Sequence, residues 1–214
     1  MLLASFRSAS SRSSLVDSAR ASIQGAQEVD LRSFPCEGIV AQLSRAFAAA
    51  GATATSPDLM AQMISFREAA SLAAAWDSEV SHQRPFIVVC ERPASTLFSE
   101  VQALRLLLQV GGGETKHGDL YRKLVSVEDA FLSGRIECLF ATTPDWEALD
   151  IQASDVALAV LSGLHVRGVL VAPMPRAADG FPKALKQAYR ARARDLESAL
   201  DPIPALITKG GKSP

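Results

Sequence analysis

The residues MLLASFRSASSRSSL (1–15) decide which fold the sequence predicts. An apolar run at Met1–Ala4 leads directly into serines and arginines, and a helical pattern begins at Leu15. A short strand followed by such a loop and a helix is a common way to bind phosphate. The helix start offers unpaired backbone N–H groups and a partial positive charge, and arginine offers a two-pronged donor. The segment predicts the first strand of an α/β fold with an anion site beside it.

Residues 1–16 also allow a second interpretation. They contain six serines, Arg7, Arg12 and no acidic residue, a composition typical of a mitochondrial transit peptide. The apolar run is placed as a strand would be, and the pattern continues without a break to a second predicted strand at Gln27–Leu31. This continuity favours a folded loop, and organellar targeting stays open as the alternative.

Composition narrows the class of protein. The 214 residues suit one sizeable domain, and 22 Lys and Arg against 23 Asp and Glu leave no overall field that would attract nucleic acid or an anionic membrane. No apolar run approaches the length that spans a bilayer. The three widely spaced cysteines, Cys36, Cys90 and Cys138, suit reduced thiols rather than disulfides or zinc. We therefore expect a cytoplasmic protein without a nucleic-acid or membrane partner.

Strands and helices alternate along the whole chain. The clearest strand is Pro85–Cys90, whose β-branched and aromatic run is typical of a strand buried on both faces of a parallel sheet. The other predicted strands are Gln27–Leu31, Ala52–Thr55, Ile136–Ala141 and Val166–Ala172, and the predicted helices are Leu15–Ile23, Ile39–Ala50, Pro57–Trp76, Thr96–Val110, Tyr121–Leu132, Trp146–Leu164 and Phe181–Leu200. This order predicts an α/β fold with a doubly wound, mostly parallel sheet and helices on both faces.

In such sheets the ligand lies beyond the carboxyl ends of the strands, where the strand order reverses. We therefore expect three loops to converge there: Ser5–Ser14, Ser56–Met60 and Glu91–Ser95. The triple glycine at 111–113 follows a helix rather than preceding one, so it is interpreted as a helix stop and not as a phosphate loop. The three histidines are too far apart in sequence to indicate a metal site.

The opening loop resembles the phosphate loop G-S-x-R-x-x-S-x-N-x-x-L of the NADPH-dependent FMN reductases, a family of flavodoxin-like quinone and chromate reductases. The matching positions are Ser5, Arg7, Ser10 and Leu15, with Ala4 and Arg12 in place of the glycine and the asparagine. Family-like segments follow in the same order at Asp30–Pro35, Ser56–Asp58, Phe66–Trp76, Arg84–Val89 and Gln102–Leu108. The resemblance covers about residues 2–110.

The resemblance implies a flavodoxin-like domain at 1–134. The strand at Val166–Ala172 and its helix have no counterpart in the family, so residues 135–200 are interpreted as a C-terminal strand-helix extension of the same sheet, and the Pro-, Gly- and Lys-rich residues 201–214 as a flexible tail. The resemblance also implies an NAD(P)H oxidoreductase that binds FMN, takes a hydride from NADPH or NADH and reduces a quinone, free flavin or similar small acceptor, and it implies a homodimer. The implied cofactor-binding residues are Ser5, Arg7, Ser10 and Arg12 at the phosphate, and Ser56, Pro57 and Asp58 near the ring.

Two departures from the family pattern affect the flavin ring. Leu59 and Met60 replace the Tyr-Asn pair beside the ring, and Glu91–Ser95 replaces a glycine-rich stretch whose bare backbone approaches the flavin edge. Pro93 donates no backbone hydrogen bond, and Glu91 would place a negative charge near a ring that becomes anionic when reduced. The alternative is therefore a flavodoxin-like module that has lost its cofactor and serves as a binding or assembly subunit. A third hypothesis is that the loop binds a nucleotide or a sugar phosphate.

Overall fold

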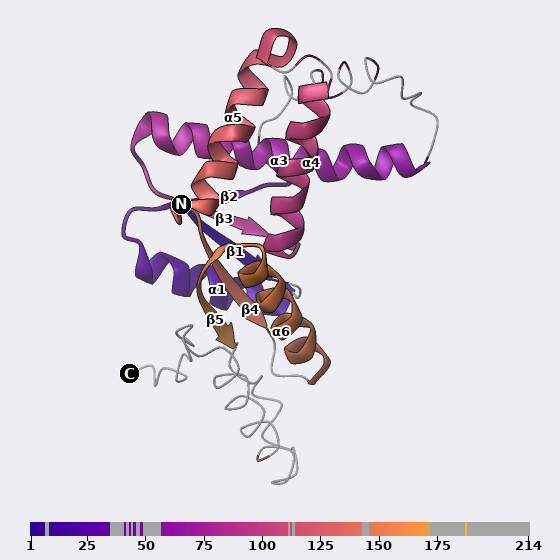
Figure 1. Cartoon of the computed structure of the whole chain (residues 1–214). Helices are drawn as coiled ribbons and strands as arrows, with labels where there is room; N and C mark the ends of the chain where they lie inside the picture. The colour runs from indigo at the N-terminus through magenta and orange to yellow at the C-terminus, as the bar shows by residue number, and fades with distance from the viewer. Residues whose placement is uncertain are drawn as a thin grey trace.

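The computed structural model describes residues 1–6, 9–34, 41, 43, 45, 48, 57–110, 112, 114–142, 146–171 and 187. Its centre is a five-stranded sheet, in the order β2-β3-β1-β4-β5, in which every neighbouring pair is parallel (Figure 1). The strands are β1 (Leu2–Phe6), β2 (Gln27–Asp30), β3 (Phe86–Cys90), β4 (Glu137–Thr142) and β5 (His165–Val171). The predicted α/β class is confirmed.

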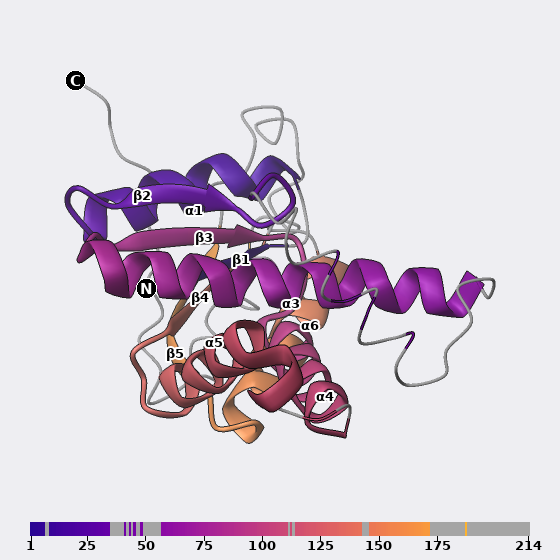
Figure 2. The same ribbon diagram turned by 90° about the horizontal axis from the view of Figure 1, so that it is seen from above.

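Helices cover both faces of the sheet, but unequally. The helices are α1 (Ala9–Ser22), α3 (Pro57–His82), α4 (Ala94–Val110), α5 (Glu114–Leu132) and α6 (Trp146–Leu161). Figure 2 shows α1 on one side of the sheet and α3, α4, α5 and α6 on the other. Right-handed crossovers produce this division, because the step from β1 to β2 runs in one direction along the sheet and every later step runs in the other.

Side chains of the two interior strands β1 and β3 alternate between two hydrophobic cores. Every residue of both strands is buried, which explains their continuous apolar sequences. The smaller core lies under α1, and the larger core lies under the other helices. The residues of β1 and β3 that face α1 are Leu2, Ala4, Phe6, Ile87 and Val89, and those that face the larger core are Leu3, Phe86, Val88 and Cys90.

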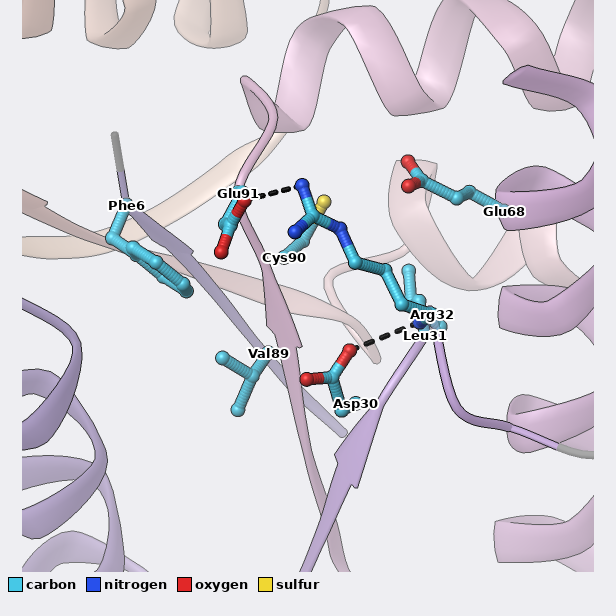
Figure 3. Close-up of a pocket in the computed structure, with 8 residues that line it drawn as sticks. All are labelled: Phe6, Asp30, Leu31, Arg32, Glu68, Val89, Cys90 and Glu91. Atoms are coloured by element: carbon cyan, nitrogen blue, oxygen red, sulfur yellow. Dashed lines mark hydrogen bonds and ion pairs between the residues drawn. The ribbon is translucent and has the colours of Figure 1, made fainter. Parts of the chain in front are cut away.

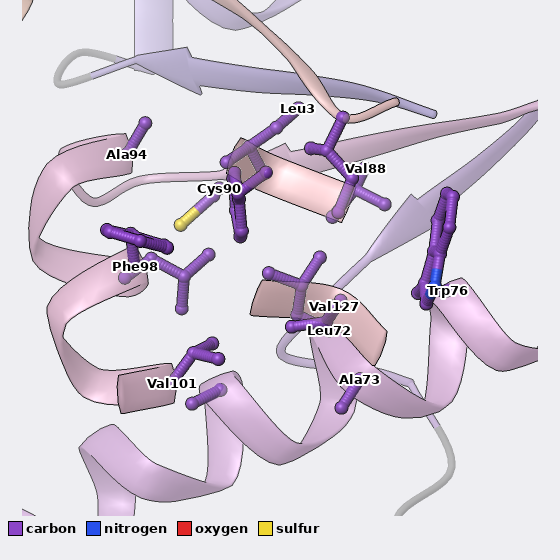
Figure 4. Packing of buried hydrophobic residues seen from close by; sticks show 14 of the residues in the cluster. Leu3, Leu72, Ala73, Trp76, Val88, Cys90, Ala94, Phe98, Val101 and Val127 are labelled. Carbon is purple, nitrogen blue, oxygen red and sulfur yellow. The ribbon is translucent and has the colours of Figure 1, made fainter. Parts of the chain in front are cut away.

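The larger core depends on the small residues of α3. Alanines at positions 69, 70, 73 and 75 are fully buried, so the helix can pack closely (Figure 4). Trp76 closes one side of this core, with its indole Nε1 donating to Ser126 Oγ at 2.9 Å and the Arg135 guanidinium 5.4 Å from its ring centre. On the facing helices, the rings of Phe98 and Phe131 meet edge to face at 5.3 Å.

The order of the strands differs from the flavodoxin-like order. Flavodoxin-like sheets run 2-1-3-4-5, with the first two strands adjacent. Here β3 lies between β2 and β1: Val29 of β2 pairs with Val88, and Val88 pairs with Leu3 of β1. Among the described strands, β1 is the central one and β2 is at the edge.

None of the described helices combines the length and apolarity needed to cross a bilayer.

Several predicted boundaries were wrong. Helix α1 begins at Ala9 rather than Leu15, so the serine-rich stretch is helical and not a loop up to Ser14. The polar residues after Trp76 were expected to form a connection, but they extend α3 to His82, where Gln83 takes a φ of 52° and ends the helix. Helices α4 and α5 also start earlier than predicted, and α6 ends earlier. The errors at the start of α1 and at the end of α3 fall where polar helical residues lack an apolar stripe, and α6 ends before Gly163, which takes a φ of 77°.

The remaining predicted elements are either confirmed or lie outside the described residues. The strands expected at 27–31, 85–90, 136–141 and 166–172 are confirmed to within two residues, as is the break at the triple glycine, between α4 and α5. The strand expected at 52–55 and the tail at 201–214 lie outside the described residues. So do most of the helices expected at 39–50 and 181–200, of which only single residues are described.

Candidate functional site

The carboxyl ends of β1 and β3 form the point where the winding of the sheet reverses. After β1 the chain passes to α1 on one face, and after β3 it passes to α4 on the other. Ligands of open α/β sheets bind outside such a point. Three loops were predicted to converge here, and the structure places Ser5 of the first beside Arg92 of the third. Arg7, Ser8 and Ser56 lie outside the described residues.

Ser5, near the end of β1, contacts the loop that follows β3. Its side chain is buried, with 2% of the residue exposed, and its Oγ donates a hydrogen bond to the backbone carbonyl of Arg92 at 2.7 Å. A serine hydroxyl has one proton to donate. In this arrangement Ser5 therefore joins β1 to the loop after β3, and its hydroxyl proton is not directed at a phosphate.

Arg12, in the first turn of α1, contacts the acidic side chains of β2. Its Nη2 lies 3.0 Å from Oδ2 of Asp30 and 3.6 Å from Oε1 of Glu28. Glu28 also binds Arg20, about two turns further along α1, at 2.7 Å. Arg12 and Arg20 thus neutralise the carboxylates of an edge strand, and 39% of the Arg12 side chain remains exposed.

The other predicted cofactor residues are described in part or not at all. Ser10 is the second residue of α1, and Pro57 and Asp58 begin α3, where proline suits the first helical position. The side chains of these three residues lie outside the described set, as do Arg7 and Ser56 as a whole. The predicted roles of all five residues stay predictions.

A pocket opens at the ends of β1, β2 and β3 (Figure 3). It offers about 10 Å³ of open space, enough for about one water molecule. Its lining consists of Phe6, Asp30, Leu31, Arg32, Glu68, Val89, Cys90 and Glu91. Arg32 and Glu91 form an ion pair at this pocket, and the backbone N–H of Arg32 donates to Oδ1 of Asp30 at 2.9 Å.

Arg92 anchors the loop behind this pocket. Its guanidinium is held between Glu68 of α3, at 3.3 Å, and both carboxylate oxygens of Glu100 of α4. Burial lowers the pKa of Arg92, but the hydrogen bonds and charges of Glu100 and Glu68 outweigh burial, so the pKa lies above its usual value. Arg92 is therefore a permanent cation that ties α3, α4 and the β3 loop together.

Cys90 faces this site without being reactive. Its Sγ accepts a hydrogen bond from the backbone N–H of Arg92 at 3.3 Å. Burial raises the pKa of the Cys90 thiol to about 12, so the thiol stays protonated near neutral pH and is a poor nucleophile. Within the described part of the chain, no group of three or more His, Cys, Asp or Glu side chains is placed to hold a metal ion.

The fit of this site to a flavin differs between its two ends. The start of α1 lies where a helix can bind a phosphate, so the phosphate end fits the local architecture. The pocket beside it has room for about one water molecule and is lined by three carboxylates, so in this arrangement it admits neither a flavin ring nor a second phosphate. The flavin ring has no place among the described pocket residues.

Sequence reasoning missed most of this pocket. Asp30 and Arg32 were noticed only as a family-like strand end, and Glu68 was hidden in an alanine-rich helix. The available signal was position, since Asp30 ends the strand β2 and Glu91 directly follows the apolar strand β3, so both must lie at the carboxyl edge of a parallel sheet.

Comparison with known proteins finds no family model that matches this chain and no matching curated protein. The resemblance of the opening loop to FMN reductases therefore stays a prediction that rests on the residues themselves.

Proposed function

We propose that this protein binds a phosphorylated ligand at the start of α1 and that the ligand is FMN. The position of β1 supports this most strongly. It is the central strand, and the helix that follows it leaves on the opposite face from the helices after its neighbours β3 and β4. The start of α1, with its unpaired N–H groups, then opens at the switch point. Arg7 and Ser10 are the side chains proposed to bind the phosphate.

The proposed activity is reduction of a small acceptor, such as a quinone or free flavin, at the expense of NADPH or NADH. Bound FMN would supply the hydride chemistry, and the protein would supply binding and orientation. Ser56, Pro57 and Asp58 are proposed to lie near the ring. The pocket residues leave too little space for the ring, so this proposal requires that the ring be bound beside the start of α3 instead.

A homodimer is part of the same proposal, through the helix α3. The second half of this helix, including Ala69, Leu72 and Trp76, is buried in the protein's own core. A dimer contact through α3 must therefore use its first half, where the sequence places Leu59 and Met63. Light scattering of the purified protein measures the oligomeric state directly.

We expect the purified protein to show flavin absorbance, or to bind added FMN in a fluorescence titration. Arg7→Ala should weaken binding by about tenfold or more, since a charge-assisted contact of about 1.5–3 kcal/mol is lost. Arg45→Ala removes an exposed arginine that is not part of the opening loop; it is the matched control and should bind as the wild type does. FMN at about 100 times its Kd should raise the free energy of unfolding by about 2.7 kcal/mol.

A colourless protein whose unfolding is unaffected by FMN would contradict the flavin proposal and support the second candidate, a binding or assembly module without cofactor. Two contacts favour this candidate: the Ser5 proton is used by the Arg92 carbonyl, and Arg12 is paired with Asp30. A protein that ignores FMN but binds inorganic phosphate would instead support a nucleotide or sugar phosphate ligand.

A further inference from the structure

We propose that the outward face of α6 is a contact surface for a second copy of this chain, with Ile151, Leu158 and Leu161 at its centre. This inference goes beyond the proposed function, because it depends on no ligand. It also uses a different helix from the α3 contact, toward the other end of the sheet: α6 packs on β4 and β5, whereas α3 packs on β3 (Figure 1).

The polarity of α6 is inverted between its two faces. The inner face buries Gln152 and Asp155, which are 1% and 4% exposed. The outer face presents Leu158 and Leu161, which are 54% and 84% exposed. Single apolar residues on a surface are ordinary, but a helix that is apolar on all sides is normally buried on all sides. The outward face of α6 therefore has the composition of an interface.

The residues of this face follow the spacing of a helix-helix contact. They recur at intervals of three, four and three residues along α6: Ile151, Ser154, Leu158 and Leu161. This spacing places them in one stripe, and it is the spacing at which two helices pack side by side at a small angle. Ser154 is small, so a second helix can approach closely at the middle of the stripe.

The apolar surface continues from α6 onto the end of α5. A Cβ atom on Gly163, just past the end of α6, would lie 3.8 Å from Cδ2 of Leu132. Leu132 is the last residue of α5 and is half exposed. Its side chain therefore lies beside the end of the stripe and widens the apolar surface there.

The charge of this face favours a second copy as its occupant. In a two-fold contact between identical chains each surface meets itself, so a charge close to the axis meets a like charge. Between Ile151 and Leu161 the only charged residue is Asp155, which is buried on the inner face. The stripe can therefore meet its own copy without repulsion, and it presents no charge that would attract an acidic or basic surface.

The size of the surface indicates a weak dimer. A stable interface buries about 800 Å² on each partner, usually around aromatic or arginine anchors. Here α6 contributes three large aliphatic side chains and α5 one more. We therefore expect a Kd of about 10–100 μM for the dimer. The contact leaves the proposed phosphate site open in both copies, because α1 lies on the opposite face of the sheet (Figure 2).

Sedimentation equilibrium at concentrations from about 5 to about 300 μM, which bracket the expected Kd, tests this inference. Leu158→Glu should raise the Kd of the dimer by about tenfold or more, because the stripe loses a central side chain and gains a like charge on each copy. Val80→Glu is the matched control. Val80 is 56% exposed and lies on α3, so this variant should dimerise as the wild type does.

A charge swap separates loss of the contact from loss of folding. Leu158→Glu and Leu158→Lys should each associate weakly alone, whereas an equal mixture should associate about threefold or more tightly, because unlike charges then meet across the interface. A mixture no tighter than either variant would overturn the α6 contact.

Two further results would also overturn the α6 contact. One is a wild type that stays monomeric up to about 300 μM, well above the expected Kd. The other is a Leu158→Glu variant that dimerises as the wild type does, which would leave the homodimer through α3 standing. FMN binding is measured separately and should be equal in Leu158→Glu and wild type, so failure of the flavin proposal is distinguishable from failure of the α6 contact.

Discussion

Replacing Arg92 with methionine is expected to lower the free energy of unfolding by about 3 kcal/mol. Methionine keeps most of the side-chain volume but leaves the carboxylates of Glu68 and Glu100 facing each other without their cation. Removal of one partner from a buried pair costs about 3–5 kcal/mol, and the lower end applies because the Arg92 side chain is 25% exposed. The loss amounts to a large fraction of the stability of a typical domain.

Urea unfolding of three variants measures this effect. Arg20→Met is the matched control, since Arg20 forms an exposed pair with Glu28 and its loss should change stability by about 0.5 kcal/mol or less. Adding Glu68→Gln and Glu100→Gln to Arg92→Met should restore part of the lost stability, because the stranded charges are then removed. Equal effects of Arg92→Met and Arg20→Met would show that the deeper pairs do not hold the loop.

The parts of the fold that could be predicted are those with a local signal. The apolar runs at β1 and β3 are readable because interior parallel strands are buried on both faces. Helix α4 is readable from apolar residues at helical spacing, namely Leu97, Val101, Leu104 and Leu108, and all four are buried. The beginning of α1 was missed because its serines and Arg12 also suit a loop, and only packing of Leu15 and Ala19 against the sheet makes the whole segment helical.

The strand order and the pocket could not be predicted from the sequence, because they depend on contacts between distant segments. Nothing in β2 or β3 indicates that β3 inserts between β2 and β1, because any parallel neighbour would satisfy their backbone groups. The partners of Arg92 lie 24 and 8 residues away in sequence, and only the packing of α3 against α4 brings both to one guanidinium. Likewise, Arg12 was assigned to a phosphate from its residue type, whereas its contact with Asp30 depends on how α1 crosses β2.

Raising the pH from about 8 to about 10.5 is expected to lower the free energy of unfolding by about 4 kcal/mol through two cysteines alone. Cys90 and Cys138 are 4% and 0% exposed, and burial raises the pKa of each thiol from 9.0 to about 12. Above pH 9 the unfolded chain releases both protons while the folded chain keeps them. The contribution of each protonated thiol to the free energy of unfolding is thus fully present below pH 9. It is lost between pH 9 and about pH 12, at about 1.4 kcal/mol per pH unit.

Denaturant unfolding of wild type and Cys138→Val across this pH range tests the effect. Tyrosines and lysines also titrate here, but they are common to both proteins and cancel in the difference between the two slopes. Valine changes the packing by an amount that does not depend on pH, so a cavity or a clash shifts the whole curve without altering its slope. The variant should therefore lose stability less steeply, by about 1.4 kcal/mol per pH unit. Equal slopes would mean that the Cys138 thiol titrates in the folded protein as it does in the unfolded chain, and that the core around β4 admits water.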